Sequence, residues 1–223
     1  MIDFAELRRG MVDGQVRVND VTDLRIVGAM LDIPRERFVP DHLRSLAYID
    51  DDLLIRPEAD GKPARYLMEP MVFAKLLQLA DIQEDELVLD VAGGTGYPAA
   101  ILSRLCGQVI SVDDDAAFTT ASNASLADLG ISNVASFTGP QAAGWASEAP
   151  YDVIFINGAI EEVPASLTAQ LKEGGRLVAV VGQGGAGRAV AFTKVGGALS
   201  ERVAFNAAVP VLPAFVAPPH FTF

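Results

Sequence analysis

The sequence is poor in the residues that form disulfides and metal centres. Its 223 residues include one cysteine, Cys106, and two histidines, His42 and His220. One cysteine cannot form an intramolecular disulfide, and two histidines far apart in the chain do not make a cluster of metal ligands. We therefore expect no metal cofactor and a reducing compartment, with the cytoplasm as the default location.

Positive charge and long apolar runs are also scarce. Lys and Arg number 17 against 29 Asp and Glu, which gives a formal net charge of -12. Binding to nucleic-acid phosphates requires a basic face, so we expect no nucleic-acid partner. No apolar run approaches the roughly 20 residues of a membrane helix, and the charged residues 1–15 lack the apolar core of a signal peptide. The sequence therefore predicts no membrane association.

Hydrophobic residues make up 50% of the chain, enough for a sizeable core. Apolar residues recur at helical spacing through much of residues 1–45, which predicts helices there. Residues 47–70 carry acids, prolines and a glycine, and predict an irregular surface segment of the kind that often carries function. A further helix is expected to begin at Pro70, because proline suits the first turn of a helix.

From residue 86 onward, strands and helices are predicted to alternate. The predicted strands are residues 86–91, 108–113, 133–139, 151–158 and 176–182, and the predicted helices are residues 97–106, 116–130 and 164–175. Such alternation is typical of a parallel sheet covered on both faces. Residues 188–212 instead place a Gly-Gly turn between two β-like runs. The expected fold class is therefore α/β and Rossmann-like, a mostly parallel sheet with an antiparallel C-terminal hairpin and an N-terminal helical cap.

A glycine-rich loop follows the first of these strands, in "LVLDVAGGTGYPAAIL", residues 87–102. Asp90 ends the strand, and Gly93, Gly94 and Gly96 lead into a helix, which lets a nucleotide approach the backbone closely. The loop lacks the Gly-Lys-Ser/Thr sequence of a phosphate-binding NTPase loop. Residues 94–99 do satisfy the dinucleotide pattern G-x-G-x-x-A, so NAD and S-adenosylmethionine both remain candidate ligands.

The position of Asp90 favours S-adenosylmethionine. A carboxylate just before the loop would repel a pyrophosphate at the helix N-terminus. The sulfonium and ammonium groups of S-adenosylmethionine are cationic, so the same carboxylate favours that ligand. Asp113 ends the next predicted strand and is expected to accept hydrogen bonds from both ribose hydroxyls of either ligand.

Four segments resemble the protein-L-isoaspartate O-methyltransferase family. Residues 15–40, "QVRVNDVTDLRIVGAMLDIPRERFVP", are similar to its N-terminal signature, a helix ending in Ala-Met before a Val/Ile-Pro-Arg-Glu-x-Phe-Val-Pro run. The others are similar to its Ala-Tyr-x-Asp-x-x-Leu stretch, its cofactor motif and its Leu-Lys-x-Gly-Gly-x-Leu-Val segment, at residues 46–55, 87–105 and 171–182. The N-terminal signature is the most specific, because other S-adenosylmethionine enzymes share only the glycine loop.

The resemblance implies methyl transfer from S-adenosylmethionine to isoaspartyl residues of damaged proteins or peptides, a repair reaction. It implies one methyltransferase domain, 1–223, in which residues 1–80 form the helical cap and substrate-side loop and residues 81–223 form the cofactor-binding core. The cofactor-binding residues that it implies are Asp90, Ala92, Gly93, Gly94, Gly96, Asp113, Gly139 and Gln141. An acceptor carboxylate, with a pKa of about 3.9, is already ionised at pH 7, so the reaction needs no general base.

The chain departs from the family at the active-site loop. The family's Thr-Ile-Ser-x-Pro loop places a hydroxyl near the reacting carboxylate, and residues 66–70 here read Tyr-Leu-Met-Glu-Pro. Met68 therefore stands at the hydroxyl position, and a thioether cannot donate a hydrogen bond. Loss of one donor to a buried charged group costs about 1.5–3 kcal/mol, so we expect weakened catalysis. Glu69 would repel a substrate carboxylate if its side chain faced the pocket. The alternative is that it begins the next helix as a favourable N-terminal acid.

Two cofactor positions also differ from the family. After the third core strand the family generally has Gly-Asp-Gly, whose acid contacts the adenine amino group, where this chain has Gly139-Pro140-Gln141. Gln141 is expected to offer its amide oxygen to the adenine instead. The first glycine of the loop is replaced by Ala92, whose methyl group is tolerated if the backbone keeps a negative φ.

Two other functions stay open at this point. One is an S-adenosylmethionine-dependent methyltransferase with a different acceptor, and the other is a cofactor-binding protein without catalysis.

Overall fold

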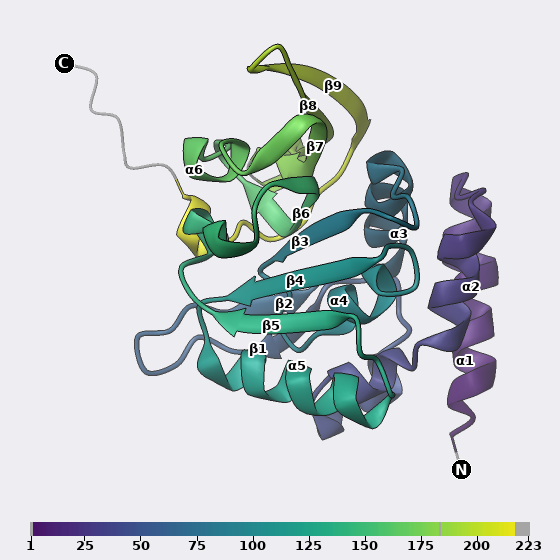
Figure 1. Ribbon diagram of the computed structural model, residues 1–223. Helices are drawn as coiled ribbons and strands as arrows, with labels where there is room; N and C mark the ends of the chain where they lie inside the picture. The colour runs from purple at the N-terminus through teal and green to yellow at the C-terminus, as the bar shows by residue number, and fades with distance from the viewer. Residues whose placement is uncertain (1, 183, 217–223) are drawn as a thin grey trace.

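The centre of the fold is a seven-stranded sheet of order β5-β4-β3-β6-β7-β8-β9, seen in a computed structural model that describes residues 2–182 and 184–216. The strands are β3 (Leu87–Val91), β4 (Gln108–Asp113), β5 (Val134–Thr138), β6 (Tyr151–Ile160), β7 (Leu171–Val181), β8 (Arg188–Val195) and β9 (Ala198–Asn206). Strands β3 to β7 pair in parallel, and β8 and β9 add antiparallel neighbours. The predicted α/β fold with its antiparallel C-terminal hairpin is confirmed (Figure 1).

Both faces of this sheet are buried, because successive residues of the central strands enter different clusters of apolar side chains. Val88 of β3 is in register with Val109 and Val153 in one cluster, and Leu89 is in register with Ile110 and Ile154 in the other. The helices that cover the sheet are α3 (Pro70–Ala80), α4 (Tyr97–Leu102), α5 (Ala116–Asp128) and α6 (Ala165–Thr168). In Figure 1, α5 runs below β5.

The N-terminal segment is helical, as predicted. Helices α1 (Phe4–Met11) and α2 (Leu24–Asp32) lie beside one another at the right of Figure 1. Asp3 caps α1 by accepting hydrogen bonds from the backbone N–H groups of Ala5 and Glu6, at 3.0 Å each. Short turns of 3-10 helix at Arg35–Phe38 and Asp41–Leu46 continue the chain toward the sheet.

The structure differs from the sequence-based prediction in two segments. Residues 47–70 contain a separate two-stranded antiparallel sheet of β1 (Leu53–Arg56) and β2 (Arg65–Leu67), whose strands are too short to show a clear period. The predicted helix 164–175 is wrong beyond Thr168, since β7 already begins at Leu171. Gly175 lies so close to the β6 backbone that an added Cβ would be 2.9 Å from the Tyr151 carbonyl oxygen.

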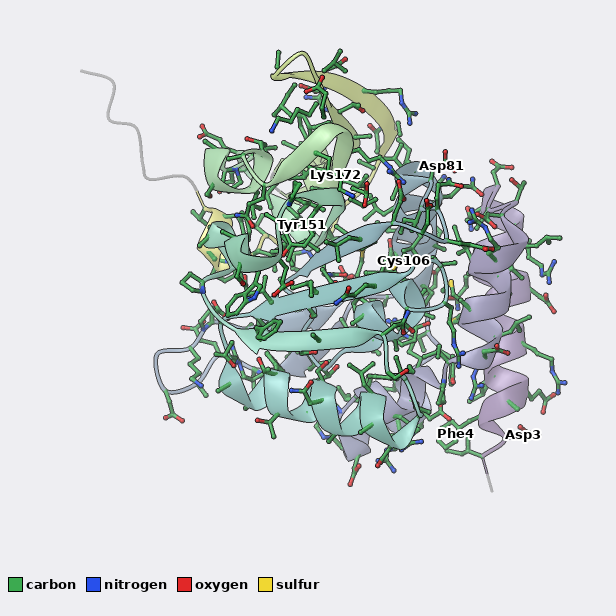
Figure 2. All side chains as sticks on the ribbon, viewed as in Figure 1. Asp3, Phe4, Asp81, Cys106, Tyr151 and Lys172 are labelled. Atoms are coloured by element: carbon green, nitrogen blue, oxygen red, sulfur yellow. The ribbon has the colours of Figure 1, made fainter. Side chains whose placement is uncertain are left out.

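Contacts at the beginnings of β6 and β7 stabilise the end of the sheet opposite its carboxyl edge, and Tyr151 and Lys172 are labelled in Figure 2. Lys172 of β7 forms a 2.7 Å ion pair with Asp152 of β6. The Tyr151 hydroxyl donates a 2.6 Å hydrogen bond to the Trp145 carbonyl. Cys106 is buried beyond α4, and desolvation raises the pKa of its thiol to about 12, so it behaves as a small apolar residue.

Neither a metal cluster nor a membrane helix is found in the described ranges. No group of three or more His, Cys, Asp or Glu side chains is placed to hold a metal ion within residues 2–182 and 184–216. In the same residues, none of the helices has both the length and the apolar character needed to cross a bilayer. His220 lies outside the described residues.

Candidate functional site

Two adjoining cavities lie where the carboxyl ends of the central strands meet the β1–β2 hairpin. The first, here called the loop cavity, borders the glycine loop at Gly93. The second, the hairpin cavity, borders the hairpin at Arg65. Met68 and Asn157 line both cavities. The structure thus brings the predicted cofactor loop and the predicted active-site loop to one place, at the strand edge toward which β4 and β5 point in Figure 1.

The glycine loop is shaped by close approach to neighbouring side chains. A Cβ added at Gly93 would lie 2.3 Å from the Asp90 carboxylate and 2.7 Å from the Ser111 hydroxyl. Gly94 and Gly96 have φ of 57° and 98°, in the left-handed region that favours glycine. The turn that the sequence predicts here therefore requires glycine for space at one position and for backbone conformation at two.

The condition under which Ala92 was expected to be tolerated, a negative φ, is not met. Its φ is +60°, so the backbone is left-handed at a residue that carries a methyl group. The Ala92 amide donates a 2.9 Å hydrogen bond to the Val112 carbonyl of β4. This bond and the burial of the methyl group, which is 4% exposed, hold the residue in a conformation that costs about 1–2 kcal/mol for a side chain with a Cβ.

Asp90 lies beneath the glycine loop rather than on the cavity surface. Its side chain has no exposed area and accepts hydrogen bonds from the Ser111 hydroxyl at 2.7 Å and the Asn157 amide at 2.6 Å. Desolvation raises its pKa to about 6, against the lowering effect of these two bonds. Asn157 in turn keeps a buried side-chain oxygen without a hydrogen-bond partner. Asp90 therefore positions Asn157, which offers this acceptor at the cavity wall.

Asp113 ends β4 as predicted, but its carboxylate is occupied. Arg65 Nη2 lies 2.7 Å from Asp113 Oδ2 and Nη1 lies 3.1 Å from Oδ1, and each side chain is 4% exposed. The backbone N–H groups of Gly94 and Asp115 donate to the same carboxylate at 3.0 and 3.1 Å. The oxygens that were expected to accept from a ribose are thus already satisfied within the chain.

Gln141 and Asp114 line a shallow outer cavity that Arg65 also borders. Together with Gly139 they also line a second shallow cavity. The Gly139 amide donates a 2.9 Å hydrogen bond to the Asp113 carbonyl. Gln141 is 1% exposed, and its side-chain amide donates to Asp114 at 3.0 Å. The Gln141 amide nitrogen is therefore used within the chain.

The loop that carries Met68 and Glu69 is held by backbone contacts. Arg35 donates a 2.8 Å hydrogen bond to the Met68 carbonyl, and Asp52 accepts a 2.8 Å hydrogen bond from the Glu69 amide. Met68 is 6% exposed, so its thioether forms an apolar part of the cavity wall. Glu69 occupies the N-cap position of α3, but its side chain forms no capping hydrogen bond. Desolvation, together with the negative charge of Asp52, raises the pKa of Glu69 to about 7.

The comparison with known families agrees with this arrangement. A family model described as protein-L-isoaspartate(D-aspartate) O-methyltransferase matches residues 9–212. The chain belongs to this family. The match includes α2, the hairpin, the glycine loop and the C-terminal strands, and it ends one residue before Pro213, which also lines the hairpin cavity.

Named relatives and solved structures give the same family. Protein-L-isoaspartate O-methyltransferase 2 of Shewanella sediminis is 36% identical over 179 residues, which is 80% of this chain and 71% of that protein. A protein of the same name from Anaeromyxobacter sp. is 39% identical over 171 residues, 77% of this chain and 68% of that protein. A solved protein-L-isoaspartate O-methyltransferase superposes with a TM-score of 0.78 and 28% identity, over 92% of this chain and 65% of that one.

A second solved structure supports the fold alone. It is titled as a putative protein-L-isoaspartate O-methyltransferase from Plasmodium falciparum in complex with S-adenosyl-L-homocysteine. Its TM-score is 0.76 at 17% identity, over 96% of this chain and all of that chain.

Sequence reasoning missed three side chains at this methyltransferase site. Arg65 lies only three residues before Met68, inside the segment predicted to be irregular. Asn157 of β6 directly follows Ile156, the last β6 residue that pairs with β3, so it lies at the carboxyl end of β3, where polar residues commonly meet ligands. Arg35 belongs to the Pro-Arg-Glu run of the family signature, is fully buried, and leaves Nη1 without a partner beside the ring of Tyr97. Of the three, only Asn157 could have been found from the sequence, because a polar residue at the carboxyl end of a predicted strand often contacts a ligand.

We predict that Gly93→Ala lowers the free energy of unfolding by about 1–3 kcal/mol, because the new Cβ overlaps a buried carboxylate that cannot retreat. Urea denaturation measures the change. Ala92→Gly is the matched control at the adjacent position. It should change stability by less than about 1 kcal/mol, because relief of the left-handed backbone offsets the lost methyl group. A Gly93→Ala variant as stable as the wild type would contradict the close approach.

We also predict that Glu69→Gln raises the melting temperature more at pH 8 than at pH 5. The raised pKa means that the folded protein binds this proton more tightly than the unfolded chain, whose Glu titrates near pH 4.3. The stabilising contribution is therefore complete below that pH and is lost as the pH rises through about 7. Glu201→Gln on exposed β9 is the control, and it should change the melting temperature by the same amount at both pH values. An equal effect of both substitutions would refute the assignment.

Proposed function

We propose that this protein transfers the methyl group of S-adenosylmethionine to the free carboxyl group of isoaspartyl residues in damaged proteins or peptides. Family membership and the names of its relatives support this function. The structural observation that carries it is the cavity shared by two loops. Gly93 and Gly94 of the glycine loop and Met68 of the acceptor-side loop line the same loop cavity, so a cofactor and an acceptor can meet there.

The residues around these cavities fit a cationic cofactor. Asn157 presents an unpartnered buried oxygen that can accept a hydrogen bond from an ammonium group. The buried carboxylate of Asp90 lies behind it and favours positive charge in the cavity. On the ribose and adenine side, Asp113 can accept hydrogen bonds only if Arg65 leaves its carboxylate, and Asp114 and Gln141 line the outer cavity. This donor and acceptor set would disfavour a pyrophosphate.

The chemistry asks little of the protein beyond positioning. When bound, S-adenosylmethionine supplies an electrophilic methyl group to the carboxylate oxygen, and the neutral thioether S-adenosylhomocysteine remains. No proton is transferred, so no general base is required. The chain must desolvate the acceptor, align its oxygen and supply hydrogen-bond donors that offset the cost of a buried anion. Met68 excludes water from the cavity wall but donates no hydrogen bond.

The division of work within the chain is also a proposal. We assign acceptor binding to residues 1–80 and cofactor binding to residues 81–223 of one methyltransferase domain, because the hairpin and the sheet edge build the cavities together. The cytoplasm is the proposed location, since a chain with a single cysteine gains nothing from an oxidising compartment.

Methyl-transfer activity is tested with a radiolabelled methyl donor and an isoaspartyl peptide. We expect incorporation of label into this peptide and none into the same peptide with ordinary aspartate, because only the isoaspartyl linkage presents a free α-carboxylate. Base-labile release of labelled methanol identifies the product as an ester. Equal labelling of the two peptides, or labelling of neither, would reject the proposed acceptor.

Cofactor choice is tested separately by titration calorimetry. S-adenosylmethionine and S-adenosylhomocysteine should bind, and NAD should give no heat of binding, because its pyrophosphate would face the acidic site. Tight binding of NAD without a response to S-adenosylmethionine would overturn the cofactor assignment.

A further inference from the structure

The ion pair between Arg65 and Asp113 fills the place between the hairpin cavity and the outer cavity. Arg65 lines both, so its side chain separates the acceptor side of the site from the side of Asp114 and Gln141. Each Asp113 oxygen already has two donors, one from the guanidinium and one from the backbone. A carboxylate accepts about four hydrogen bonds, so no capacity is left for ribose hydroxyls. A cofactor that spans the two cavities must displace Arg65 from Asp113.

The hairpin that carries Arg65 can shift without disturbing the central sheet. Strands β1 and β2 pair only with each other and form a sheet of their own. Arg56 and Lys62 of the same hairpin are paired with Asp115, which tethers the hairpin next to α5 when Arg65 is released. Movement of a single side chain, with the hairpin still tethered, is therefore sufficient to free Asp113.

If Arg65 is displaced from Asp113, its guanidinium can serve as a hydrogen-bond donor in the hairpin cavity. Among the described residues that line it, Arg65 is the cation and Asp52 is the acid. An acceptor carboxylate in this cavity would otherwise face Asp52 and the thioether of Met68, which donate no hydrogen bond when Asp52 is ionised, and the neutral hydroxyl of Tyr66, which can donate one. A guanidinium can hold a carboxylate through two parallel hydrogen bonds. Arg65 is thus suited to replace the hydroxyl that the chain lacks at residue 68.

We propose that Arg65 is a positioning residue that changes partner during the reaction cycle. In the empty protein it pairs with Asp113, the cofactor ribose then takes Asp113, and the released guanidinium binds the acceptor carboxylate. Cofactor and acceptor therefore bind in that order, with the cofactor raising the affinity for the acceptor. This inference rests on the proposed function for its acceptor, whereas the displacement of Arg65 by the cofactor does not depend on which acceptor is used.

The first arm of the test measures the affinity for S-adenosylhomocysteine by calorimetry in the wild type, Arg65→Met and Arg65→Lys. Loss of a charge-assisted pair that must otherwise be broken should tighten binding by about tenfold or more in Arg65→Met. The affinity of Arg65→Lys should lie between those of the wild type and Arg65→Met, because an ammonium does not reproduce the bidentate pair. Unchanged or weaker binding in Arg65→Met would overturn the displacement.

The second arm measures the affinity for an isoaspartyl peptide with and without saturating S-adenosylhomocysteine. In the wild type, binding should be at least about tenfold tighter with S-adenosylhomocysteine. In Arg65→Met this coupling should vanish, and the KM for the peptide in turnover should rise more than kcat falls. Equal coupling in wild type and variant would show that the released Arg65 stays with Asp114, which its Nη1 already contacts at 3.3 Å, and would reject its role toward the acceptor.

Two further variants keep the inference falsifiable if Arg65→Met does not fold. Asp113→Asn should release Arg65 without a cofactor, so peptide binding in the absence of S-adenosylhomocysteine should strengthen, and no change would count against the inference. Met68→Ser restores a hydroxyl and should raise turnover more in the Arg65→Lys background than in the wild type. A wild type that binds S-adenosylhomocysteine but no isoaspartyl peptide would refute the proposed acceptor, while the first arm would still decide the displacement.

Discussion

The site depends on one buried carboxylate at the end of β3. Asp90 has no exposed surface, and hydrogen bonds from Ser111 of β4 and Asn157 of β6 join it to both neighbouring strands. An unpaired charge at such depth would be very costly, so these two donors must stay in place. Gly93 packs directly on this cluster, and no other residue type fits there. The position of the glycine loop, and with it the floor of the loop cavity, follows from how Asp90 is satisfied.

The sequence predicted the parts of the site that are built by neighbouring residues. The Asp90-to-Gly96 stretch carries its own strand, turn and helix signals, and the alternation of strands with helices placed Asp113 at the same sheet edge. It could not predict that Asp113 is occupied, because its partner Arg65 is 48 residues away in a hairpin whose strands are too short to show a period. It also missed the left-handed Ala92, since glycine marks that conformation and alanine does not.

Two cations of this acidic chain, Arg35 and Arg65, are buried at the site. Arg35 and Arg65 are almost fully buried, although arginine is rarely buried without a partner. Arg65 is neutralised by Asp113, whereas Arg35 donates only to the Ala47 and Met68 carbonyls and keeps one nitrogen unpartnered at the loop cavity. Desolvation by burial lowers the pKa of Arg35. Arg35 borders the loop cavity and Arg65 borders the hairpin cavity, so each cavity has one buried cation that can face an acceptor carboxylate.

The change from a hydroxyl to a thioether at residue 68 alters the chemistry of the wall without moving it. The loop is fixed through its backbone, by Arg35 at the Met68 carbonyl and by Asp52 at the Glu69 amide. Neither contact uses the side chain of residue 68 or 69, so both positions can vary while the loop keeps its place against Gly93 and Asn157. The hydrogen-bond donor missing at residue 68 is most easily replaced by a side chain that is close to it in the chain. Arg65 meets this condition, because β2 already delivers its side chain to the wall that Met68 forms.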